Sequence, residues 1–590
     1  MRKCTHTVLK VDNLRLTDLD SKNKQVRDAL QPGNIINVIY IYHGSKSHNV
    51  YIGQTKHFIE RHKEHSKEEK FINADFDEVL VIFSKYFDGT VLDDVEKQMI
   101  TYFVTDYSDK PKVDSPKPKW SVLNGTLGNT VNEYEGYEDV STEVILPAWE
   151  DVLYDELHWV TTPRIEKLRT NALVKYSPIK TLTPEQDKLI NEIVDHPDTN
   201  YVINGDAGTG KTVLLTNLVA RLLKSEKRGD IRIGVVVQPN WEKTAKNIFS
   251  VFGMDTNNLF IGTSTEIIKD NHRYDIIVVD ESHKLSRKYG KQHPSFNQVY
   301  ADPEFRNCKS HLEILQKMGK QIVLMYDVLQ AIRPANLTRD EFKKLTTGYQ
   351  KEYLTTQFRI QVEDNNYTSD DYVNGIKYLL YKDTGLLDES LTHFNPDFNR
   401  AVFNDTSEDD AYFGYFTDKP LHKIREWLSR DEDFNPEHID RILAGLCEPW
   451  QQSDGKDPTK THWHEDDIHL RWNSKQENWI NNKGSENEVG SVFAVQGVDL
   501  NKVGVLIGND LEVGPDNKLR GNPSHFHNVN GKFPKAERDS PEDQFEFTLF
   551  VLNIYYVLLT RGIDGIRLGF WKNDAFRKYM EETLDIHHNQ

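Results

Sequence analysis

Residues 201–212 read YVINGDAGTGKT, an apolar strand followed at once by a glycine-rich loop, a lysine and a threonine. The next stretch, VLLTNLVARLLK over residues 213–224, has the spacing of an amphipathic helix. Glycines in such a loop let backbone N–H groups surround phosphate oxygens, and the lysine adds a positive charge. The order of strand, loop and helix therefore predicts a binding site for a nucleoside triphosphate.

Within this site we expect Gly205, Gly208 and Gly210 to shape the loop. Lys211 is predicted to reach the β and γ phosphates, and the Thr212 hydroxyl to hold Mg²⁺. ATP and Mg²⁺ are the expected cofactors.

A second apolar strand, YDIIVVD over residues 274–280, ends in Asp280 and Glu281. A carboxylate at the end of a buried parallel strand lies beside the phosphate loop. We therefore predict that Asp280 binds the same Mg²⁺ and that Glu281 polarises the attacking water.

Uninterrupted apolar runs recur after residue 181, for example IGVVVQ, QIVLMYD, VGVLIGND and GIRLGF. Such runs are typical of parallel sheets buried on both faces. They predict an α/β protein with two parallel-sheet lobes, at residues 181–345 and 346–590, the second interrupted by a charge-rich insertion at about 388–483. The histidines of the polar inserts are expected in loops, because no paired cysteines accompany them: His462, His464, His469, His525 and His527.

The N-terminal third has a different pattern. Residues 34–135 alternate short β-rich runs with two helical stretches, which predicts a small α/β domain. Residues 1–33 are predicted to be an N-terminal arm. Residues 136–180 are predicted to be a linker that contains a packed helix.

The small domain contains, in this order, Val38-Ile39-Tyr40, Tyr51-Ile52-Gly53, Arg61, His65, Glu96 and Asn124. The order is that of GIY-YIG nucleases, and the stretch from residue 35 to about 132 resembles that family, with Val38 where the family usually has glycine. Arg61 and His65 are four residues apart, so both project from one helix face toward the same phosphate. Arg61 is expected to stabilise charge on phosphorus. Glu96 is expected to hold Mg²⁺ or a similar cation.

The attacking water of this predicted nuclease has more than one candidate activator. Tyr40 and Tyr51 could position or deprotonate it, and His65 is the competing base. Asn124 resembles the family's supporting polar residue. A folded but inactive nuclease used only for binding remains an alternative.

From residue 181 onward an ordered series of motifs resembles a superfamily 1 helicase core of the DUF2075 or Schlafen-like type: LTPEQ, VLMYDVLQ, LTTQFR, the segment around 496 and YYVLLTRG. The resemblance implies that Gln186 contacts adenine, and that Asp327 and Gln330 sense the γ-phosphate. It also implies that Arg359 and Arg561 reach the γ-phosphate across a cleft, where arginine forks suit the charge of phosphoryl transfer.

Other residues are predicted to couple the nucleotide to a nucleic-acid strand. Gln496 and Gly497 resemble the motif that links nucleotide state to strand contact. Contacts to the sugar-phosphate chain are expected from hydroxyl and amide groups, with plain loops as the alternative: Gln238, Asn240, Thr263 and Ser264.

The composition is compatible with this interpretation. A net charge of -19 does not exclude nucleic acid, because a motor holds its strand in a local groove. The three cysteines are far apart, which disfavours disulfides and a cysteine zinc site. The absence of a long apolar run predicts a cytoplasmic protein without a membrane partner.

We therefore predict an ATP-dependent helicase or translocase coupled to a metal-dependent endonuclease, with DNA favoured over RNA as partner. By analogy of architecture, the role would be bacterial defence against foreign DNA. DNA repair or recombination is one alternative, and an ATP-switched clamp that neither unwinds nor cuts is another. A small-molecule kinase is disfavoured by the later motifs. A homo-oligomer and accessory defence proteins are further candidate partners.

Overall fold

The computed structural model places most of the chain. The residues that it describes are 5–17, 24–29, 31, 33–106, 119–124, 134, 136–169, 171–254, 256–288, 294–331, 335–360, 362, 366–388, 392–405, 407, 411–436, 438–451, 453–475, 479–495, 498–528 and 540–587.

These residues form two compact units, each built from several chain segments. The segments of the first unit are Met1–His196, Thr212–Ile231 and Lys243–Leu259. The segments of the second unit are Pro197–Lys211, Arg232–Glu242 and Phe260–Gln590. Both predicted parallel-sheet lobes contribute to the second unit.

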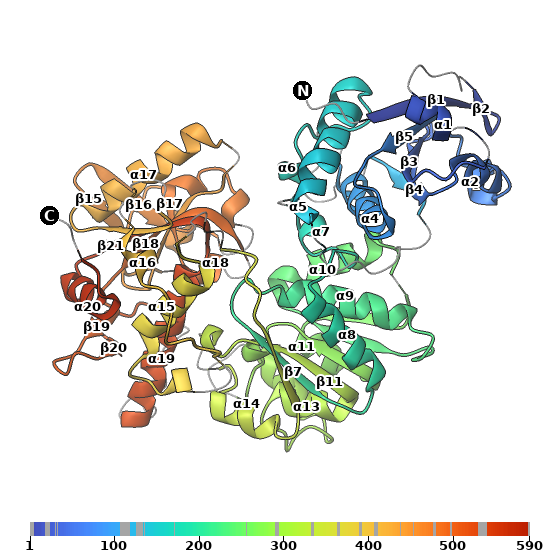
Figure 1. The fold of residues 1–590 in the computed structure, drawn as a ribbon. Helices are drawn as coiled ribbons and strands as arrows, with labels where there is room; N and C mark the ends of the chain where they lie inside the picture. The colour runs from blue at the N-terminus through green and yellow to red at the C-terminus, as the bar shows by residue number, and fades with distance from the viewer. Residues whose placement is uncertain are drawn as a thin grey trace. The chain divides into compact units, whose positions relative to one another are not determined.

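The first unit contains a six-stranded sheet with the order β2-β1-β5-β3-β4-β6 (Figure 1). Strand β3 pairs antiparallel with both β4 and β5, and β1 pairs antiparallel with β5. The strands are β1 Thr5–Asp12, β2 Arg15–Thr17, β3 Val38–His43, β4 Asn49–Thr55, β5 Glu78–Phe83 and β6 Ser121–Val122.

Residues 5–17 belong to this sheet, which corrects the expectation of an N-terminal arm. Leu9 and Val11 of β1 are buried in the core that also holds Tyr40 and Phe58. The sequence did not predict β1 because the first residues of this strand are polar. The alternation of apolar and polar side chains that is typical of a strand is seen only in its second half.

Helices cover the sheet and continue into the linker. The helices of the small domain are α1 Lys24–Ala29, α2 Phe58–His65, α3 Glu69–Ile72 and α4 Gly89–Thr105. The linker contains α5 Tyr137–Val140, wider π-type turns over Ser141–Ile145 and Pro147–Glu156, α6 Ile165–Arg169 and α7 Ala172–Lys175. Trp149 is fully buried, and its ring lies 5.4 Å from the ring of Phe103 on α4. The linker is therefore a packed segment of the first unit.

The rest of the first unit is helical. It includes α8 Pro184–Asp195, most of α9 Lys211–Lys224 and most of α10 Pro239–Val251. Thr183 and Gln186 form a capping box at the start of α8, in which each side chain accepts from the other residue's backbone N–H.

The first sheet of the second unit is parallel, with the order β12-β7-β11-β10-β8-β9 (Figure 1). β10 pairs parallel with β8 and β11, and β7 pairs parallel with β11 and β12. The strands are β7 Tyr201–Gly205, β8 Ile233–Val236, β9 Leu259–Gly262, β10 Tyr274–Val279, β11 Gly319–Tyr326 and β12 Gln350–Leu354. The central strands are almost entirely buried, as the unbroken apolar runs predicted.

Shorter elements surround this sheet. They are α11 Ser264–Lys269, α12 Pro294–Gln298, α13 His311–Met318 and α14 Arg339–Leu345, with 3₁₀ turns at Ser282–Lys284, Val299–Ala301 and Val328–Gln330.

The second sheet of this unit has the order β13-β21-β18-β14-β17-β16-β15, and among the described residues its strands pair in parallel except for β15 with β16. The strands are β13 Phe413–Phe416, β14 Arg441–Ala444, β15 Trp463–Glu465, β16 Ile468–Trp472, β17 Glu488–Gly490, β18 Leu500–Ile507 and β21 Gly562–Phe570. The two parallel-sheet lobes confirm the predicted fold class.

The segment 388–483 was expected as an insertion, but it contributes β13, β14, β15 and β16 to this sheet. The last strand of the chain, β21, lies between β13 and β18. The remaining elements are α15 Ser369–Tyr381, α16 Ala401–Asn404, α17 Pro420–Phe434, α18 Val492–Val495, α19 Pro541–Leu559, α20 Asp574–Leu584 and the hairpin of β19 Leu511–Val513 with β20 Leu519–Gly521.

Three of the five histidines expected in loops are at or within the β15–β16 hairpin. His464 is the cross-strand partner of His469, and His462 precedes β15. Short strands in a polar context carry little periodicity, which explains the error. None of the described helices combines the length and the apolar character needed to span a lipid bilayer.

Candidate nucleotide site and candidate nuclease site

The glycine-rich loop leaves the end of β7 and leads directly into α9. Gly208 has φ 91° and Gly210 has φ 80°, backbone conformations that favour glycine. A side chain at Gly208 would collide with Gln357 and Arg359. The Lys211 ammonium donates hydrogen bonds to the carbonyl oxygens of Gly205 and, at 2.9 Å, of Asp206. The lysine is therefore folded back onto the loop that it closes, and Thr212 follows it on α9.

Three carboxylates lie at the ends of the strands beside this loop. Asp280 and Glu281 follow β10, and Asp327 follows β11, with Asp327 Oδ2 3.8 Å from Lys211 Nζ. Burial raises the pKa of Asp280, and the neighbouring charge of Glu281 raises it further. Burial opposes ionisation of Glu281 too, but Lys284 and His283 outweigh it and hold its pKa below the usual value. An excess of buried negative charge beside a phosphate loop is chemically suited to a divalent cation.

The two strand-end segments have further internal contacts. His283 Nε2 lies 3.0 Å from Glu281 Oε2. Gln330 donates to Asp327 Oδ2 at 2.6 Å. The structure thus places Gln330 and Asp327 together, beside the loop lysine.

The segment after β12 packs on the phosphate loop. Gln357 donates its side-chain amide to Ala207 O at 2.9 Å, and Phe358 N donates to Gly208 O at 3.0 Å. Arg359 N donates to Gln357 Oε1 at 2.9 Å, and the Arg359 guanidinium pairs with Asp499. The predicted arginine therefore lies at the loop, and its partner Asp499 precedes β18 in the second lobe.

A second link joins the lobes through Asp206, inside the loop itself. Lys377 of α15 pairs with Asp206 Oδ2 at 2.6 Å and also donates to Thr392 O at 2.7 Å. Tyr556 of α19 donates to Asp206 Oδ1 at 3.0 Å. The Lys377 side chain is 1% exposed, so this ion pair is shielded from water. Sequence reasoning missed it because Asp206 occupies a variable position of the loop pattern and Lys377 belongs to no motif.

Arg561 takes a different position from Arg359. Its guanidinium donates to Val557 O and to Val498 O, each at 3.2 Å, and only 1% of the residue is exposed. Both acceptors belong to the second lobe. The structure thus brings Arg359 to the phosphate loop and holds Arg561 within the second lobe. Gln496 and Gly497 lie outside the described residues.

The predicted strand contacts are engaged in local structure. Thr263 caps α11 and donates to Glu266 Oε2 at 2.9 Å. The Ser264 hydroxyl shares a 2.9 Å hydrogen bond with His311 Nδ1. Gln238 follows β8 and is partly exposed, and the Asn240 side chain is outside the description.

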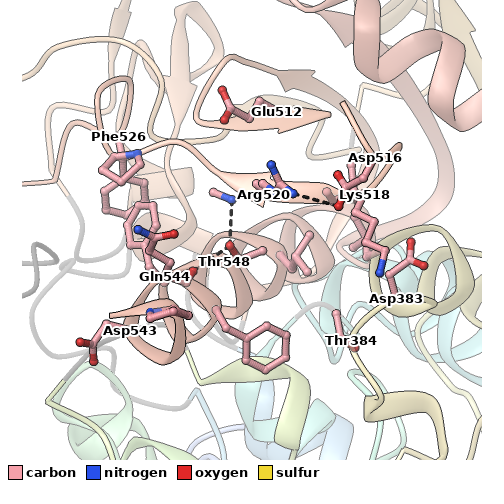
Figure 2. A pocket seen from close by; sticks show the side chains of 18 of the residues that line it. Asp383, Thr384, Glu512, Asp516, Lys518, Arg520, Phe526, Asp543, Gln544 and Thr548 are labelled. Atoms are coloured by element: carbon pink, nitrogen blue, oxygen red, sulfur yellow. Dashed lines mark hydrogen bonds and ion pairs between the residues drawn. The ribbon is translucent and has the colours of Figure 1, made fainter. Parts of the chain in front are cut away.

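The second lobe also contains a pocket of about 630 Å³ between the β19–β20 hairpin and the first half of α19 (Figure 2). Its wall is fixed by Arg520, which pairs with Asp516 at 2.9 Å, and by Thr548, whose hydroxyl accepts from Gly521 N at 3.1 Å. Two turns after Thr548, α19 carries Tyr556. One helix therefore borders both this pocket and the phosphate loop.

In the first unit, two tyrosine–histidine pairs join β3 to α2. Tyr40 OH lies 2.8 Å from His65 Nε2, and Tyr42 OH lies 2.6 Å from His62 Nδ1. His65 Nδ1 lies 2.8 Å from the Glu68 carboxylate, which can only accept, so the lone pair of Nε2 accepts the Tyr40 proton. Burial lowers the pKa of His65 to about 4, which keeps the ring neutral.

The remaining predicted nuclease residues surround this pair. The Tyr51 ring lies 5.1 Å from the His65 ring. Arg61 is partly exposed, pairs with Glu64 at 2.8 Å and interacts electrostatically with Tyr40 and Tyr51. Asn124 accepts from Ile52 N at 3.1 Å and donates to Ile52 O at 2.6 Å, which fastens it to β4.

Glu96 of α4 faces β4. Gln54 donates to Glu96 Oε2 at 3.1 Å and also to Asp93. Burial raises the pKa of Glu96 to about 7, and the charge of Asp93 adds to the effect. Two carboxylates joined by one amide form an acidic group that fits a hard divalent cation. Neither Gln54 nor Asp93 belonged to the predicted set, since no motif residue marks them.

Residues 198–571 match the family described as Schlafen group 3, DNA/RNA helicase domain. The chain belongs to this family. Its helicase domain begins just before β7 and ends just after β21, so it includes both parallel sheets of the second unit.

Relatives and solved structures give a more distant likeness. The chain is 26% identical over 454 residues to the uncharacterized protein YPL245W of Saccharomyces cerevisiae, which covers 67% of this chain and 90% of the yeast protein. The helicase domain of Pyrococcus furiosus Hef matches with 12% identity and a TM-score of 0.29, covering 67% of this chain and 97% of that one. Pif1 of Bacteroides sp. in complex with ADP-AlF4 matches with 15% identity and a TM-score of 0.27, covering 68% and 95%.

Proposed function

We propose that the chain is an ATP-driven nucleic-acid motor coupled to a metal-dependent endonuclease of the GIY-YIG type. The observation that carries this proposal is the presence, in one chain, of two separate polar clusters suited to phosphate chemistry. One lies around Lys211 in the helicase domain, and the other lies around Tyr40, His65 and Glu96 in the first unit.

In the motor, Lys211 would exchange its bonds to the loop carbonyls for bonds to the phosphates of ATP. Thr212 and Asp280 would hold Mg²⁺, which supplies charge neutralisation when bound. Glu281 would orient the attacking water, and Arg359 would stabilise the developing charge. The role of Arg561 requires a movement that carries its guanidinium from the second lobe to the nucleotide. Gln186 would contact adenine.

In the nuclease, the neutral His65 draws the proton of Tyr40 and so orients the tyrosine oxygen toward a water nucleophile. Tyr51 would help to position that water, and Arg61 would stabilise the charge on the attacked phosphate. Glu96, oriented by Gln54, would hold Mg²⁺ or a similar cation. Asn124 would support this arrangement from β4.

The preferred substrate would be DNA, in the cytoplasm, and the role would be defence of a cell against foreign DNA. DNA repair or recombination, which would use the same two activities, is the alternative role. Plasmid or phage restriction in cells, measured beside sensitivity to DNA damage, distinguishes the two: loss of the gene should relieve restriction without sensitising cells to damage.

The activity itself is tested on labelled DNA and RNA with Mg²⁺ and ATP, comparing the intact chain with Lys211→Ala and Glu96→Ala. We expect Lys211→Ala to abolish ATP turnover and Glu96→Ala to abolish cleavage alone. Lys227→Ala is the matched control for the first variant, because Lys227 pairs with Asp195 on the surface. Unchanged strand length and duplex state in the intact protein would instead indicate an ATP-switched clamp and contradict the proposal.

A further inference from the structure

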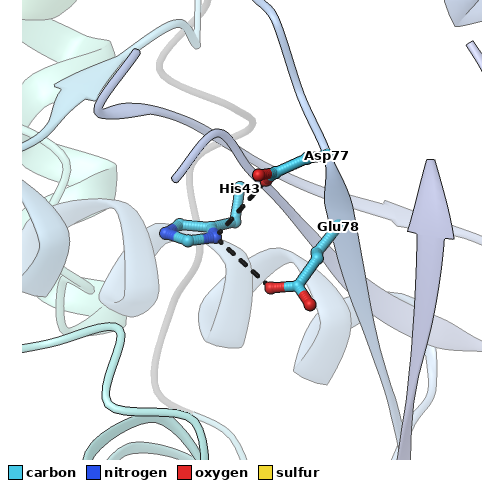
Figure 3. Close-up of side chains that lie close together, drawn as sticks. All are labelled: His43, Asp77 and Glu78. Atoms are coloured by element: carbon cyan, nitrogen blue, oxygen red, sulfur yellow. Dashed lines mark ion pairs between the residues drawn. The ribbon is translucent and has the colours of Figure 1, made fainter. Parts of the chain in front are cut away.

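A second polar group in the first unit lies away from the Tyr40 cluster. His43, at the end of β3, and Asp77 and Glu78, at the start of β5, point toward one another (Figure 3). His43 Nδ1 lies 3.9 Å from Asp77 Oδ1 and 3.7 Å from Glu78 Oε2. Their positions are fixed by the sheet, because His43 and Glu78 are cross-strand partners and Asp77 N donates to His43 O at 3.0 Å.

This group is on the other face of β3 from Tyr40 and His65, and on the same face of the sheet as Gln54, which bonds Glu96. Tyr40 and Tyr42 point into the core that contains Phe58 and Phe71. His43 is the next residue along the strand, so its side chain points to the opposite face. There its ring stacks on Trp159 at 4.2 Å and lies 5.1 Å from Trp120. His43 pairs with Val50, four residues along β4 from Gln54, so the His43 group and the Glu96 group are separate.

The residue His43 is only 5% exposed, and its Nδ1 atom is buried without a hydrogen-bond partner. A buried polar atom without a partner is costly, and most proteins avoid it. The two carboxylates toward which Nδ1 points are too distant to accept a hydrogen bond. A neutral imidazole with an available lone pair is, however, the form that binds metals.

We propose that His43, Asp77 and Glu78 form a zinc site. Imidazole nitrogen and carboxylate oxygen are both zinc ligands, and three protein ligands leave room for a water molecule. Tetrahedral ligands about 2.1 Å from zinc lie about 3.4 Å apart. The observed 3.7 and 3.9 Å exceed that spacing by a few tenths of an ångström, which a small rotation of the side chains removes.

The surroundings support the site in chemical terms. Ser45 N donates to Asp77 Oδ1 at 3.1 Å, and the Ser45 hydroxyl donates to Asp77 Oδ2, so the carboxylate is oriented. Lys119 is the nearby cation that opposes metal binding, but its ammonium donates to Trp159 O at 2.8 Å. The negative charges of Asp77 and Glu78 exceed the positive charge of Lys119, so the group has a net negative charge.

The second unit provides a useful contrast, because Asp431, His438 and Asp440 also lie close together. There, Lys502 Nζ lies 2.9 Å from Asp431 Oδ1, and His438 Nδ1 lies 2.7 Å from Asp431 Oδ2. A lysine already supplies the positive charge, and the histidine nitrogen already has a partner. The unpartnered nitrogen is what distinguishes the His43 group.

Zinc at this position would join the end of β3 to the start of β5 and hold the His43 ring against Trp159 of the linker. We therefore expect a structural contribution: zinc binding should raise the unfolding temperature of the first unit. The site would not be required for the chemistry of DNA cleavage.

The test titrates Zn²⁺ into the full chain carrying Glu96→Gln, which removes the ligand proposed for the nuclease metal. Calorimetry and thermal unfolding are compared with and without His43→Gln, Asp77→Asn and Glu78→Gln. Asp75→Asn is the matched control, since it removes an exposed carboxylate two residues from Asp77. We expect the His43→Gln chain to bind one high-affinity zinc ion fewer than the parent. Either carboxylate variant should bind that zinc ion at least tenfold more weakly, and Asp75→Asn should change neither the number of bound ions nor their affinity.

Equal zinc stoichiometry and affinity in the parent and in all three site variants would overturn the proposal, whatever the fate of the nuclease. Because a misfolded variant would also lose zinc, circular dichroism and the unfolding temperature in EDTA are recorded for each one. A parent chain that binds no zinc and gains no thermal stability from it would overturn the proposal without depending on any variant.

Discussion

Glu96 is a buried acid whose charge state depends on pH. Its pKa of about 7 in the folded chain exceeds its usual value, so the folded state binds the proton more tightly than the unfolded state does. Below about pH 4.5 the carboxyl is neutral in both states, so it does not affect the free energy of unfolding. As the pH rises from there to 7, the unfolded state loses its proton first, and the folded state is progressively destabilised.

We therefore predict that Glu96→Gln is more stable than the parent at pH 8.5 in EDTA, by about 1–3 kcal/mol, and nearly equally stable at pH 4. The measurement is urea denaturation at both pH values. Glu69→Gln, at an exposed position of α3, should show no such dependence. Added Mg²⁺ should narrow the difference at pH 8.5 by stabilising the parent; a difference that grows toward low pH would contradict the assignment.

Arg359 offers a test of the motor at the level of one side chain. Lysine at this position keeps the positive charge but loses the planar fork that suits phosphate oxygens. We predict that Arg359→Lys lowers kcat for ATP hydrolysis by about 10³-fold and leaves nucleotide affinity nearly unchanged. The readouts are strand-stimulated ATPase activity and titration with a fluorescent nucleotide.

Arg425→Lys is the control for this variant, because Arg425 bonds Asn487 on the surface of the second lobe. An unchanged kcat in Arg359→Lys would show that Arg359 does not contribute to ATP hydrolysis and that its role is the ion pair with Asp499.

At the scale of the element, α15 and α19 are joined to the phosphate loop through Asp206. Removing Lys377 leaves the Asp206 carboxylate partly buried without its ammonium partner, which typically costs about 3–5 kcal/mol. We predict that Lys377→Met lowers the stability of the second unit by an amount in this range. Combining it with Asp206→Asn should recover part of the loss, because the uncompensated charge is then gone.

A double-mutant cycle by chemical denaturation measures this coupling. Additive effects of the two substitutions would mean that the ion pair contributes no coupling energy. Lys382→Met serves as the control on the same helix, since Lys382 bonds Thr583 and not the loop.

The elements also show what the sequence could predict. β7, β8, β10 and β11 each contain an uninterrupted apolar run, so their burial in a parallel sheet could be predicted from the sequence pattern. The loop and the carboxylates Asp280 and Glu281 followed from the same pattern. β1 and β15 were missed because their apolar residues are few, and contacts such as Lys377 with Asp206 were missed because 171 positions separate the partners. Long-range pairing of single polar residues leaves no periodic signal in one sequence.

At the scale of the whole molecule, a net charge of -19 must be reconciled with binding to a phosphate backbone. If a groove of the helicase domain neutralises about four phosphates of a single strand, affinity should fall about fifty-fold between 50 and 200 mM salt. Fluorescence anisotropy with a labelled single strand measures this slope. An affinity independent of salt would exclude a basic groove, and a shallow slope would indicate stacking in place of phosphate contacts.

The position of β21 has a consequence for how the molecule is made. This strand is the last of the chain, yet it lies between β13 and β18. While a ribosome is still adding residues 562–570, both neighbours have an unpaired edge, and such edges promote aggregation. The first parallel sheet needs nothing beyond β12 and can form much earlier. Premature termination shortly before Gly562 should therefore yield a nascent product with one complete lobe and one that chaperones must protect or proteases remove.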